Sequence, residues 1–139
     1  MRISITVPGE PVAKARPRFT SSGHVYTPKK TAVYEQVIGL HARAAMKGKK
    51  ILTGAIKLSV TAYMPIPKSW SRTQKTKAMS GALRHTKKPD LSNIIKSVED
   101  ALNGIVYADD AQIDRYGESG KAFSSIPRTE IVVEAEDEA

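Results

Sequence analysis

The 26 residues from Lys87 to Gln112 constrain the fold of this chain more than any other stretch of the sequence. Their apolar side chains recur at the spacing of an α-helix and fall within an arc of roughly 120°. These side chains are Leu91, Ile94, Ile95, Val98, Ala101 and Leu102. Asp90 stands where such a helix begins, and Asn103 with Gly104 stands where it ends. We therefore predict a helix over residues 91–103 with its apolar face in the core.

The opposite face of this predicted helix is polar. The side chains expected there are Asn93, Lys96 and Asp100. The apolar residues 105–107 follow, and we predict that they form an extended segment leading to Asp109 and Asp110. An extended chain covers about 3.3 Å per residue against about 1.5 Å for a helix, so a short segment can return along the helix. We therefore expect the acidic pair to be able to reach Asp90.

Each of these polar residues also has a purely structural interpretation. Asp90 could serve only as a helix cap, worth about 1 kcal/mol. The acidic pair could be a solvated turn, and Lys96 with Asp100 a helical ion pair worth about 0.3 kcal/mol. Together, however, they match the needs of metal-dependent phosphodiester cleavage. Magnesium is commonly held by one or two carboxylates plus a substrate phosphate, and a lysine can neutralise further charge on that phosphate.

Charge is divided unevenly along the chain. Residues 1–88 hold 18 of the 22 lysines and arginines but only two of the 14 acidic residues, Glu10 and Glu35. A basic part joined to a part with concentrated carboxylates suits a polyanion held near metal ions. Many small basic proteins bind polyanions adventitiously, so the positive charge of the first part does not by itself indicate a specific nucleic-acid function. The acidic cluster is the feature that favours one.

The remaining segments predict an α+β fold. Alternating or extended segments, predicted to be strands, are residues 2–7, 55–64, 112–118 and 128–134, the last two pairing as a hairpin. Further helices are predicted over residues 31–47 and 71–79. Residues 12–30 interleave basic and aromatic side chains with Gly and Pro, and we expect an exposed loop that contacts phosphates.

A chain of 139 residues suits one compact domain. We expect a mixed or antiparallel β-sheet packed against two or three helices. We expect a basic part at residues 1–88, an acidic catalytic part at 89–134 and a frayed acidic tail at 135–139. The sequence has no cysteine, which excludes disulfides and thiolate metal sites, and its three histidines lack ligand spacing. Without a secretory leader or a long apolar run, a cytoplasmic location and no membrane contact are expected.

The pattern P-D-x-x-N-x-x-K, then D-A-L-N-G, then D-D-x-Q resembles the RusA family of Holliday junction resolvases from bacteria and their prophages. The likeness is strongest from Pro89 to Gln112. It extends more loosely to residues 14–18, 26–28, 65–70 and Lys121. The resemblance implies a small homodimeric endonuclease acting in DNA recombination and repair. Such an enzyme would use Mg²⁺, with Mn²⁺ as a substitute, to cut four-way DNA junctions by paired symmetric nicks.

The resemblance also assigns roles to single residues. Asp90 and Asp110 take the positions of essential metal-binding carboxylates, and Lys96 that of an essential lysine. By the same resemblance Asn93 and Asp109 are supporting residues. We also count Asp109 among the metal ligands and Asp100 among the supporting residues. Ser92 stands where the family usually has a further aspartate, and a hydroxyl is a poorer magnesium ligand than a carboxylate. Ser92 could still hold a metal-bound water and is counted among the expected metal residues, while Asp109 or Asp100 could supply the missing charge.

The basic residues expected to contact DNA are Lys14, Arg16, Arg18, Lys29, Lys30, Lys68, Arg72, Lys87, Lys88 and Lys121. Two symmetric nicks in a junction with near two-fold symmetry call for two sites related by a two-fold axis, which predicts a homodimer. Two other interpretations stay open. One is a branched-DNA binding module that cuts weakly or not at all because of Ser92, and the other is a nonspecific nucleic-acid binder whose acidic cluster is structural.

Overall fold

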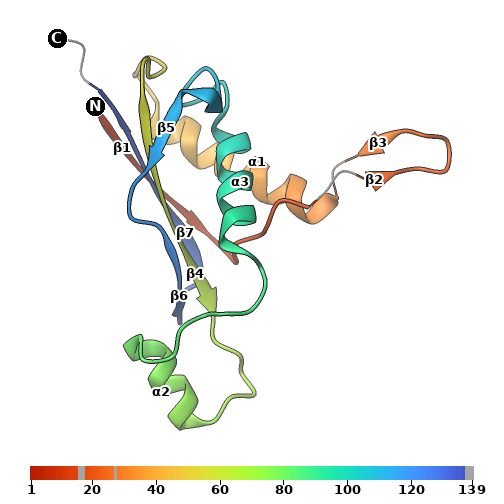
Figure 1. Cartoon of the computed structure of the whole chain (residues 1–139), viewed down its shortest axis with the longest axis vertical. Helices are drawn as coiled ribbons and strands as arrows, with labels where there is room; N and C mark the ends of the chain where they lie inside the picture. Colours follow the sequence, from red (N-terminus) through yellow and green to blue (C-terminus); the bar gives the residue numbers. More distant parts are fainter. Residues whose placement is uncertain (16–17, 27, 137–139) are drawn as a thin grey trace.

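A computed structural model covers the whole chain and describes residues 1–15, 18–26 and 28–136. The elements in chain order are β1 (Arg2–Pro8), β2 (Arg18–Phe19), β3 (Val25–Tyr26), α1 (Lys29–Ala45), β4 (Ile56–Pro65), α2 (Arg72–Ser80), α3 (Leu91–Leu102), the 3-10 turn η1 (Asp110–Gln112), β5 (Ile113–Tyr116), β6 (Gly120–Ser124) and β7 (Arg128–Ala135). Figure 1 shows their arrangement. None of the helices in the described ranges is both long enough and apolar enough to cross a bilayer.

The fold is built on a mixed five-stranded sheet. β7 lies between β1 and β4 and is antiparallel to both, while β5 and β6 run parallel to β4 along its other edge. The register places Ile5 opposite Ile131, and Ile131 opposite Val60. The expected α+β fold with a mixed sheet is therefore confirmed.

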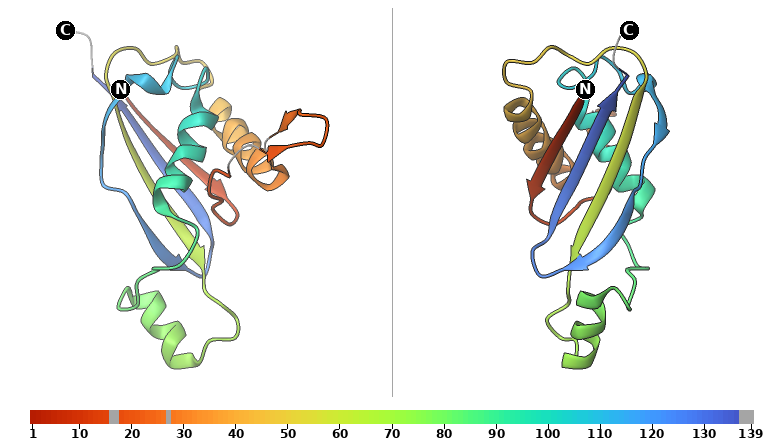
Figure 2. Two further views of the ribbon diagram at one scale, coloured as in Figure 1. Left: turned by 45° about the vertical axis from the view of Figure 1, so that its right-hand side comes forward. Right: turned by 90° about the vertical axis from the view of Figure 1, so that its left-hand side faces the viewer.

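The core lies between one face of this sheet and two helices. β1, β4 and β7 alternate buried with more exposed residues, as a strand with one covered face does. Figure 2 shows α1 and α3 on the same side of the sheet. The largest fully buried side chains are Tyr107, Ile38, Ile56, Leu58, Ile94, Leu102 and Ile131. The helix predicted over residues 91–103 is confirmed as α3, with Ile94, Val98 and Leu102 fully buried.

The prediction of an extended segment over residues 105–107 is wrong for Ile105 and Val106, which lie in a turn, whereas Tyr107 forms an isolated β-bridge with Leu52. The main-chain amides of Ile105 and Val106 both donate to the carbonyl oxygen of Leu102, at 3.1 Å. Val106 and Tyr107 are then fully buried, and the Tyr107 hydroxyl donates to the Glu99 carbonyl oxygen. A short apolar run carries no periodicity, so the burial that it gains beneath the end of α3 decides its conformation.

Two segments extend beyond the sheet and its helices. Residues 12–30, predicted to be a loop, contain the short hairpin β2–β3, and α1 begins at Lys29, two residues before the predicted start. The segment of residues 66–89, which we call the α2 lobe, lies past the end of β4 (Figure 1). Its helix is confirmed, and Ser71 caps it in a reciprocal capping box with Gln74. Trp70 and His85 pack on Phe123 of β6.

The hairpin predicted between residues 112–118 and 128–134 is also wrong. β7 enters the middle of the sheet, and β5 pairs with β4 instead. Gly117 marks the break between β5 and β6, where its amide donates to the Leu58 carbonyl oxygen. A Cβ atom at Gly117 would collide with the hydroxyl of Ser59, so this close approach requires glycine. Of the expected frayed tail, Ala135 belongs to β7, and residues 137–139 lie outside the described residues.

Candidate active site

Lys96 on α3 lies between two carboxylates. Its Nζ atom is 3.4 Å from Oδ1 of Asp100, one turn further along the same helix, and 3.7 Å from Oδ2 of Asp110. Asp110 stands at the start of η1. The structure thus brings together three residues that the sequence singled out, and it does so across two separate elements.

A second lysine extends this cluster towards α1. The Nζ atom of Lys14 lies 3.2 Å from Oδ2 of Asp100 and 2.6 Å from Oε1 of Glu35 on α1. The main-chain amide of Lys14 also donates to the carbonyl oxygen of Asn93, at 2.8 Å. Charges therefore alternate along one connected path of five residues, which we call the ion-pair chain. Its members in spatial order are Glu35, Lys14, Asp100, Lys96 and Asp110.

The two lysines of the ion-pair chain are held in their charged form. Burial alone lowers the pKa of Lys14, but its hydrogen bonds and charge interactions with Glu35 and Asp100 raise the pKa by more. The charge of Asp100 is the main cause that raises the pKa of Lys96, with a smaller effect from Asp110. Both side chains are therefore cations throughout the neutral range, as a group that stabilises a phosphate must be.

Gln112 anchors the turn that carries Asp110. Its Oε1 atom accepts hydrogen bonds from the main-chain amides of Ala108 and Asp109, at 2.9 and 3.1 Å. Its Nε2 atom donates to the carbonyl oxygens of Leu52 and Gly54. One side chain thus ties the acidic pair to the segment before β4. Asp109 itself is exposed and precedes η1.

Asp90 precedes α3 but does not cap it with its side chain. The residue occupies the N-cap position without a side-chain hydrogen bond to the helix. Its carboxylate is exposed and has no ion-pair or hydrogen-bond partner among the residues that the structure describes. The Nζ atom of Lys121 on β6 donates to the carbonyl oxygens of Lys87 and Pro89, at 2.7 and 2.9 Å. The backbone before Asp90 is therefore fastened, while its carboxylate stays available.

The acidic residues do not gather into one compact cluster. No three histidine or carboxylate side chains within the described ranges lie close enough together to share a metal ion. Asp110 lies beside Lys96 in the middle of α3. Position 96 is about 9 Å along the helix from Asp90, at about 1.5 Å per residue. The donor chemistry still suits magnesium, since two carboxylates and the Ser92 hydroxyl are hard oxygen ligands.

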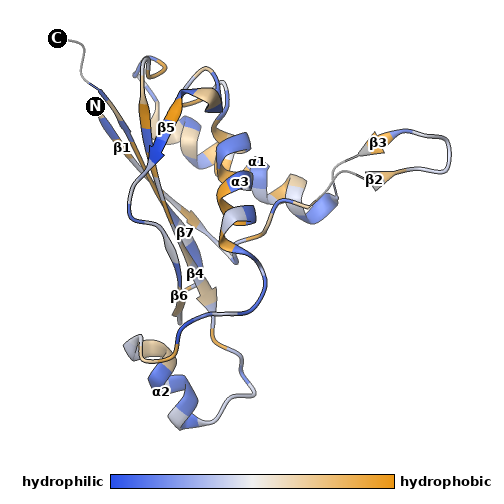
Figure 3. Cartoon of the chain, in the orientation of Figure 1, coloured by the Kyte–Doolittle hydropathy of each residue, from blue (hydrophilic) through white to orange (hydrophobic). Residues whose placement is uncertain are grey.

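The predicted DNA-binding residues fall into three groups. Lys68, Arg72, Lys87 and Lys88 are exposed on the α2 lobe, whose residues 66–89 include seven lysines and arginines and no acidic residue. In Figure 3 most of the α2 ribbon is coloured as hydrophilic. Lys29 and Lys30 are exposed at the start of α1. Lys14 and Lys121 instead bind protein groups, Arg16 lies outside the described residues, and the side chain of Arg18 is not described.

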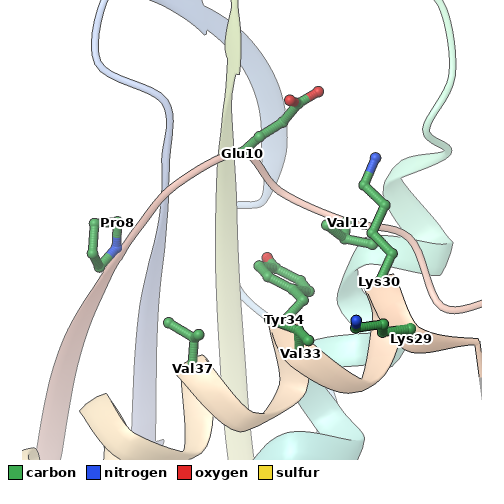
Figure 4. Close-up of a pocket in the computed structure, with 8 residues that line it drawn as sticks. All are labelled: Pro8, Glu10, Val12, Lys29, Lys30, Val33, Tyr34 and Val37. Carbon is green, nitrogen blue, oxygen red and sulfur yellow. The ribbon is translucent and has the colours of Figure 1, made fainter.

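An apolar groove of about 530 Å³ has no member of the ion-pair chain among its lining residues. Figure 4 shows it between the end of β1 and the first turns of α1. Its lining residues are Pro8, Glu10, Val12, Lys29, Lys30, Val33, Tyr34 and Val37. None of the predicted catalytic side chains lines this groove.

Two residues of the site were not identified from the sequence. Glu35 joins the ion-pair chain from α1, and Gln112 anchors the acidic turn. The signal for Glu35 was its rarity, since only two acidic residues occur in the first 88 positions. Gln112 already belongs to the D-D-x-Q pattern. Its role follows only from contacts with Leu52 and Gly54, about 60 residues away in sequence.

Comparison with known proteins identifies a family and a similar protein. The family model described as "Endodeoxyribonuclease RusA" matches residues 8–134. The chain is also 40% identical over 136 residues to a protein of Bacillus subtilis (strain 168) named "Uncharacterized protein YqaN", and the alignment covers 94% of each chain. The family match spans residues 12–30, the α2 lobe and all members of the ion-pair chain.

Proposed function

Because the chain belongs to the RusA family of endodeoxyribonucleases, we propose that it cuts four-way DNA junctions by paired, symmetric, magnesium-dependent hydrolysis. Family membership makes the chain a Holliday junction resolvase, a nuclease that hydrolyses phosphodiester bonds. We further propose that the enzyme uses magnesium, that it cuts symmetrically, and that the residues named below form its active site. We also propose a cytoplasmic role in DNA recombination and repair.

One observation carries the assignment of the site. Lys96 lies 3.7 Å from Asp110, and the same helix begins at Asp90, whose carboxylate is exposed. A phosphate bound between Asp90 and Asp110 would therefore lie within reach of a lysine that the ion-pair chain already holds. A purely structural role for Asp90 as a cap is not supported, because its side chain makes no capping hydrogen bond.

The residues would divide the work as follows. Asp90 and Asp110 would hold the magnesium ion, with Ser92 and Asp109 beside them and Asn93 and Asp100 as supporting residues. When bound, the ion would polarise the scissile phosphate and activate water for attack. The Lys96 ammonium would neutralise charge that develops on the phosphate oxygens. Gln112 and Lys121 would keep the two carboxylates in place by fixing the backbone around them.

Recognition of the junction would rest on the basic surfaces. The α2 lobe leads directly into Asp90 and carries seven lysines and arginines without an acidic residue. Such a surface contacts phosphates without reading sequence. A junction with near two-fold symmetry calls for two active sites, so we propose that two copies of the chain bind it together.

The test is cleavage of an immobile four-way junction with magnesium or manganese and with EDTA. We expect paired nicks that require metal. Asp90→Asn and Asp110→Asn should abolish nicking while junction affinity is retained. Asp114→Asn is the matched control, since Asp114 is exposed and pairs with its neighbour Arg115. Full cleavage by both site variants would reject the site, and nicks in EDTA would reject the metal.

A second candidate function is a branched-DNA binding module without efficient cleavage. It is favoured by Ser92 in place of a third carboxylate, and by the absence of a three-carboxylate group within the described residues. This candidate predicts tight junction binding with no nicks in either metal. A nonspecific binder would instead show equal affinity for the junction and for linear duplex at the same salt concentration.

A further inference from the structure

We propose that Glu35 and Lys14 are positioning residues of the active site, which act through Asp100 to hold the Lys96 ammonium beside Asp110. The inference rests on the proposed role of Lys96 in the cleavage reaction. Glu35 has no place in the sequence pattern of the site, and Lys14 was expected to contact DNA. The structure gives both residues a different task.

The ion-pair chain joins four segments that are separate in sequence. Lys14 precedes the β2–β3 hairpin, Glu35 lies on α1, Asp100 and Lys96 lie on α3, and Asp110 begins η1. Each carboxylate and each ammonium along the path has a partner of opposite charge at 2.6 to 3.7 Å. Displacing one member therefore changes the forces on the next, although in the proposed function only Lys96 and Asp110 face the substrate.

Asp100 links the two lysines of the ion-pair chain, because each of its two oxygens lies beside a different lysine. Oδ2 lies 3.2 Å from Lys14 and Oδ1 lies 3.4 Å from Lys96. With Lys14 removed, the carboxylate would keep its whole charge for Lys96 and draw that ammonium away from Asp110. With Glu35 neutralised, Lys14 would bind Asp100 more strongly and weaken its hold on Lys96. Removing Lys14 would therefore move Lys96 towards Asp100, and neutralising Glu35 would move it towards Asp110.

Exposure distinguishes Lys96 from the other four members of the ion-pair chain, since Asp110 at its end is only 27% exposed. The side chains of Lys14, Glu35 and Asp100 are 20% to 26% exposed, whereas Lys96 is 52% exposed. Lys14 is also bonded through its main chain to Asn93. A DNA phosphate could bind Lys14 only by competing with two carboxylates, while Lys96 is open to solvent. Lys14, Glu35 and Asp100 thus set the geometry and Lys96 meets the substrate.

The experiment compares Lys14→Met, Lys14→Arg and Glu35→Gln with the control Arg2→Met. Arg2 is an exposed cation on β1 that pairs with Glu134 on β7. Three quantities are measured: the single-turnover cleavage rate at saturating protein, the junction affinity over a range of salt concentrations, and the ¹⁵N signal of the Lys96 ammonium in EDTA. Lys96→Arg identifies that signal, and circular dichroism confirms that each variant is folded.

We expect Lys14→Met and Glu35→Gln to slow cleavage about 10- to 100-fold, as misplaced catalytic groups do. Junction affinity should stay within about twofold. The Lys96 signal should shift in both variants, while Lys14→Arg restores most of the rate and Arg2→Met leaves rate and signal unchanged. Lys14→Met combined with Asp100→Asn should be no slower than the slower single variant, because the residues act on Lys96 as one unit.

The inference would be overturned by a Lys14→Met variant that cleaves at the wild-type rate once saturated, but binds more weakly and loses about one unit of salt slope. That result would make Lys14 a phosphate contact. An unchanged Lys96 signal in both variants would overturn it as well. If the wild-type chain does not cleave junctions at all, the proposed function fails, yet the Lys96 signal still decides whether Lys14 and Glu35 position that ammonium.

Discussion

The Lys121 ammonium on β6 lies 2.9 Å from the main-chain carbonyl oxygen of Pro89, the residue before Asp90. A second hydrogen bond, of 2.7 Å, joins it to the carbonyl oxygen of Lys87. An ammonium carries three donors and no acceptor, so two main-chain oxygens use most of its capacity. The location of Asp90 therefore depends on a strand that follows it by some thirty residues.

Replacing Lys121 by Met should slow cleavage at saturating protein by about 10- to 100-fold, because the backbone that carries Asp90 loses both hydrogen bonds. Lys49→Met is the matched control, since Lys49 also donates to a main-chain carbonyl oxygen, that of Ala45, on the exposed end of α1. Single-turnover rates for both variants test the prediction. Weaker junction binding with a normal saturated rate would show that Lys121 contacts DNA instead.

Replacing Ser92 by Asp should lower the magnesium concentration needed for half-maximal cleavage by about tenfold, because a carboxylate adds a charged ligand at the start of α3. Ser125→Asp places the same charge on the exposed turn between β6 and β7 and should leave the magnesium dependence unchanged. The measurement is the initial cleavage rate against magnesium concentration. An unchanged half-maximal concentration would mean that residue 92 does not face the metal.

Replacing Thr129 by Val should reduce the free energy of unfolding by about 1–3 kcal/mol, because the buried Tyr34 hydroxyl loses its 2.6 Å partner. Thr129→Val combined with Tyr34→Phe should cost less than the sum of the two single changes, because both single changes remove the same hydrogen bond. Tyr116→Phe removes a hydroxyl whose 2.6 Å hydrogen bond to Glu99 is exposed to solvent, and should therefore cost less, about 0.5 kcal/mol. Urea unfolding measures all four variants.

Stability should fall below pH 6.5 through His85. Burial against Phe123, and to a lesser degree the charge of Lys121, lowers the pKa of His85 from its ordinary value of 6.5. The unfolded chain therefore takes up this proton more readily than the folded chain. The contribution is fully present above pH 6.5 and is lost as the pH falls through the lower, folded-state pKa.

The pH prediction is tested by urea unfolding of the wild-type chain and of His85→Gln between pH 5 and pH 8. We expect the difference in unfolding free energy between the two proteins to shrink as the pH falls, because only the wild-type chain carries this proton. A difference that is constant across the range would show that His85 does not titrate differently in the folded and unfolded states.

Several elements follow from sequence because their causes are local. The apolar spacing of Ile94, Val98 and Leu102 predicted α3, and the alternation in residues 55–64 predicted β4. Ser71 and Gln74 form the cap that starts α2. In each case neighbouring residues along the chain provide the pattern, and burial of one face is enough to select helix or strand.

The partners of the strands and the geometry of the site do not follow from local pattern. Residues 128–134 looked able to pair with residues 112–118, but β7 has two better partners in β1 and β4. Residues 105–107 were predicted to be extended, but Ile105 and Val106 turn back onto Leu102 at the end of α3, and Val106 and Tyr107 are fully buried. Long-range burial outweighs a weak local preference in both cases.

The sequence by itself determined the helix that presents Lys96, the acidic pair after it, the basic first part of the chain and the family. These depend on residue type and spacing alone. Only the tertiary structure decided that Lys14 and Glu35 meet Asp100, that Gln112 anchors the acidic turn and that Lys121 holds the segment before Asp90. Ion pairs and hydrogen bonds act over about 3 Å between atoms, so they depend on which distant segments the packed core brings together.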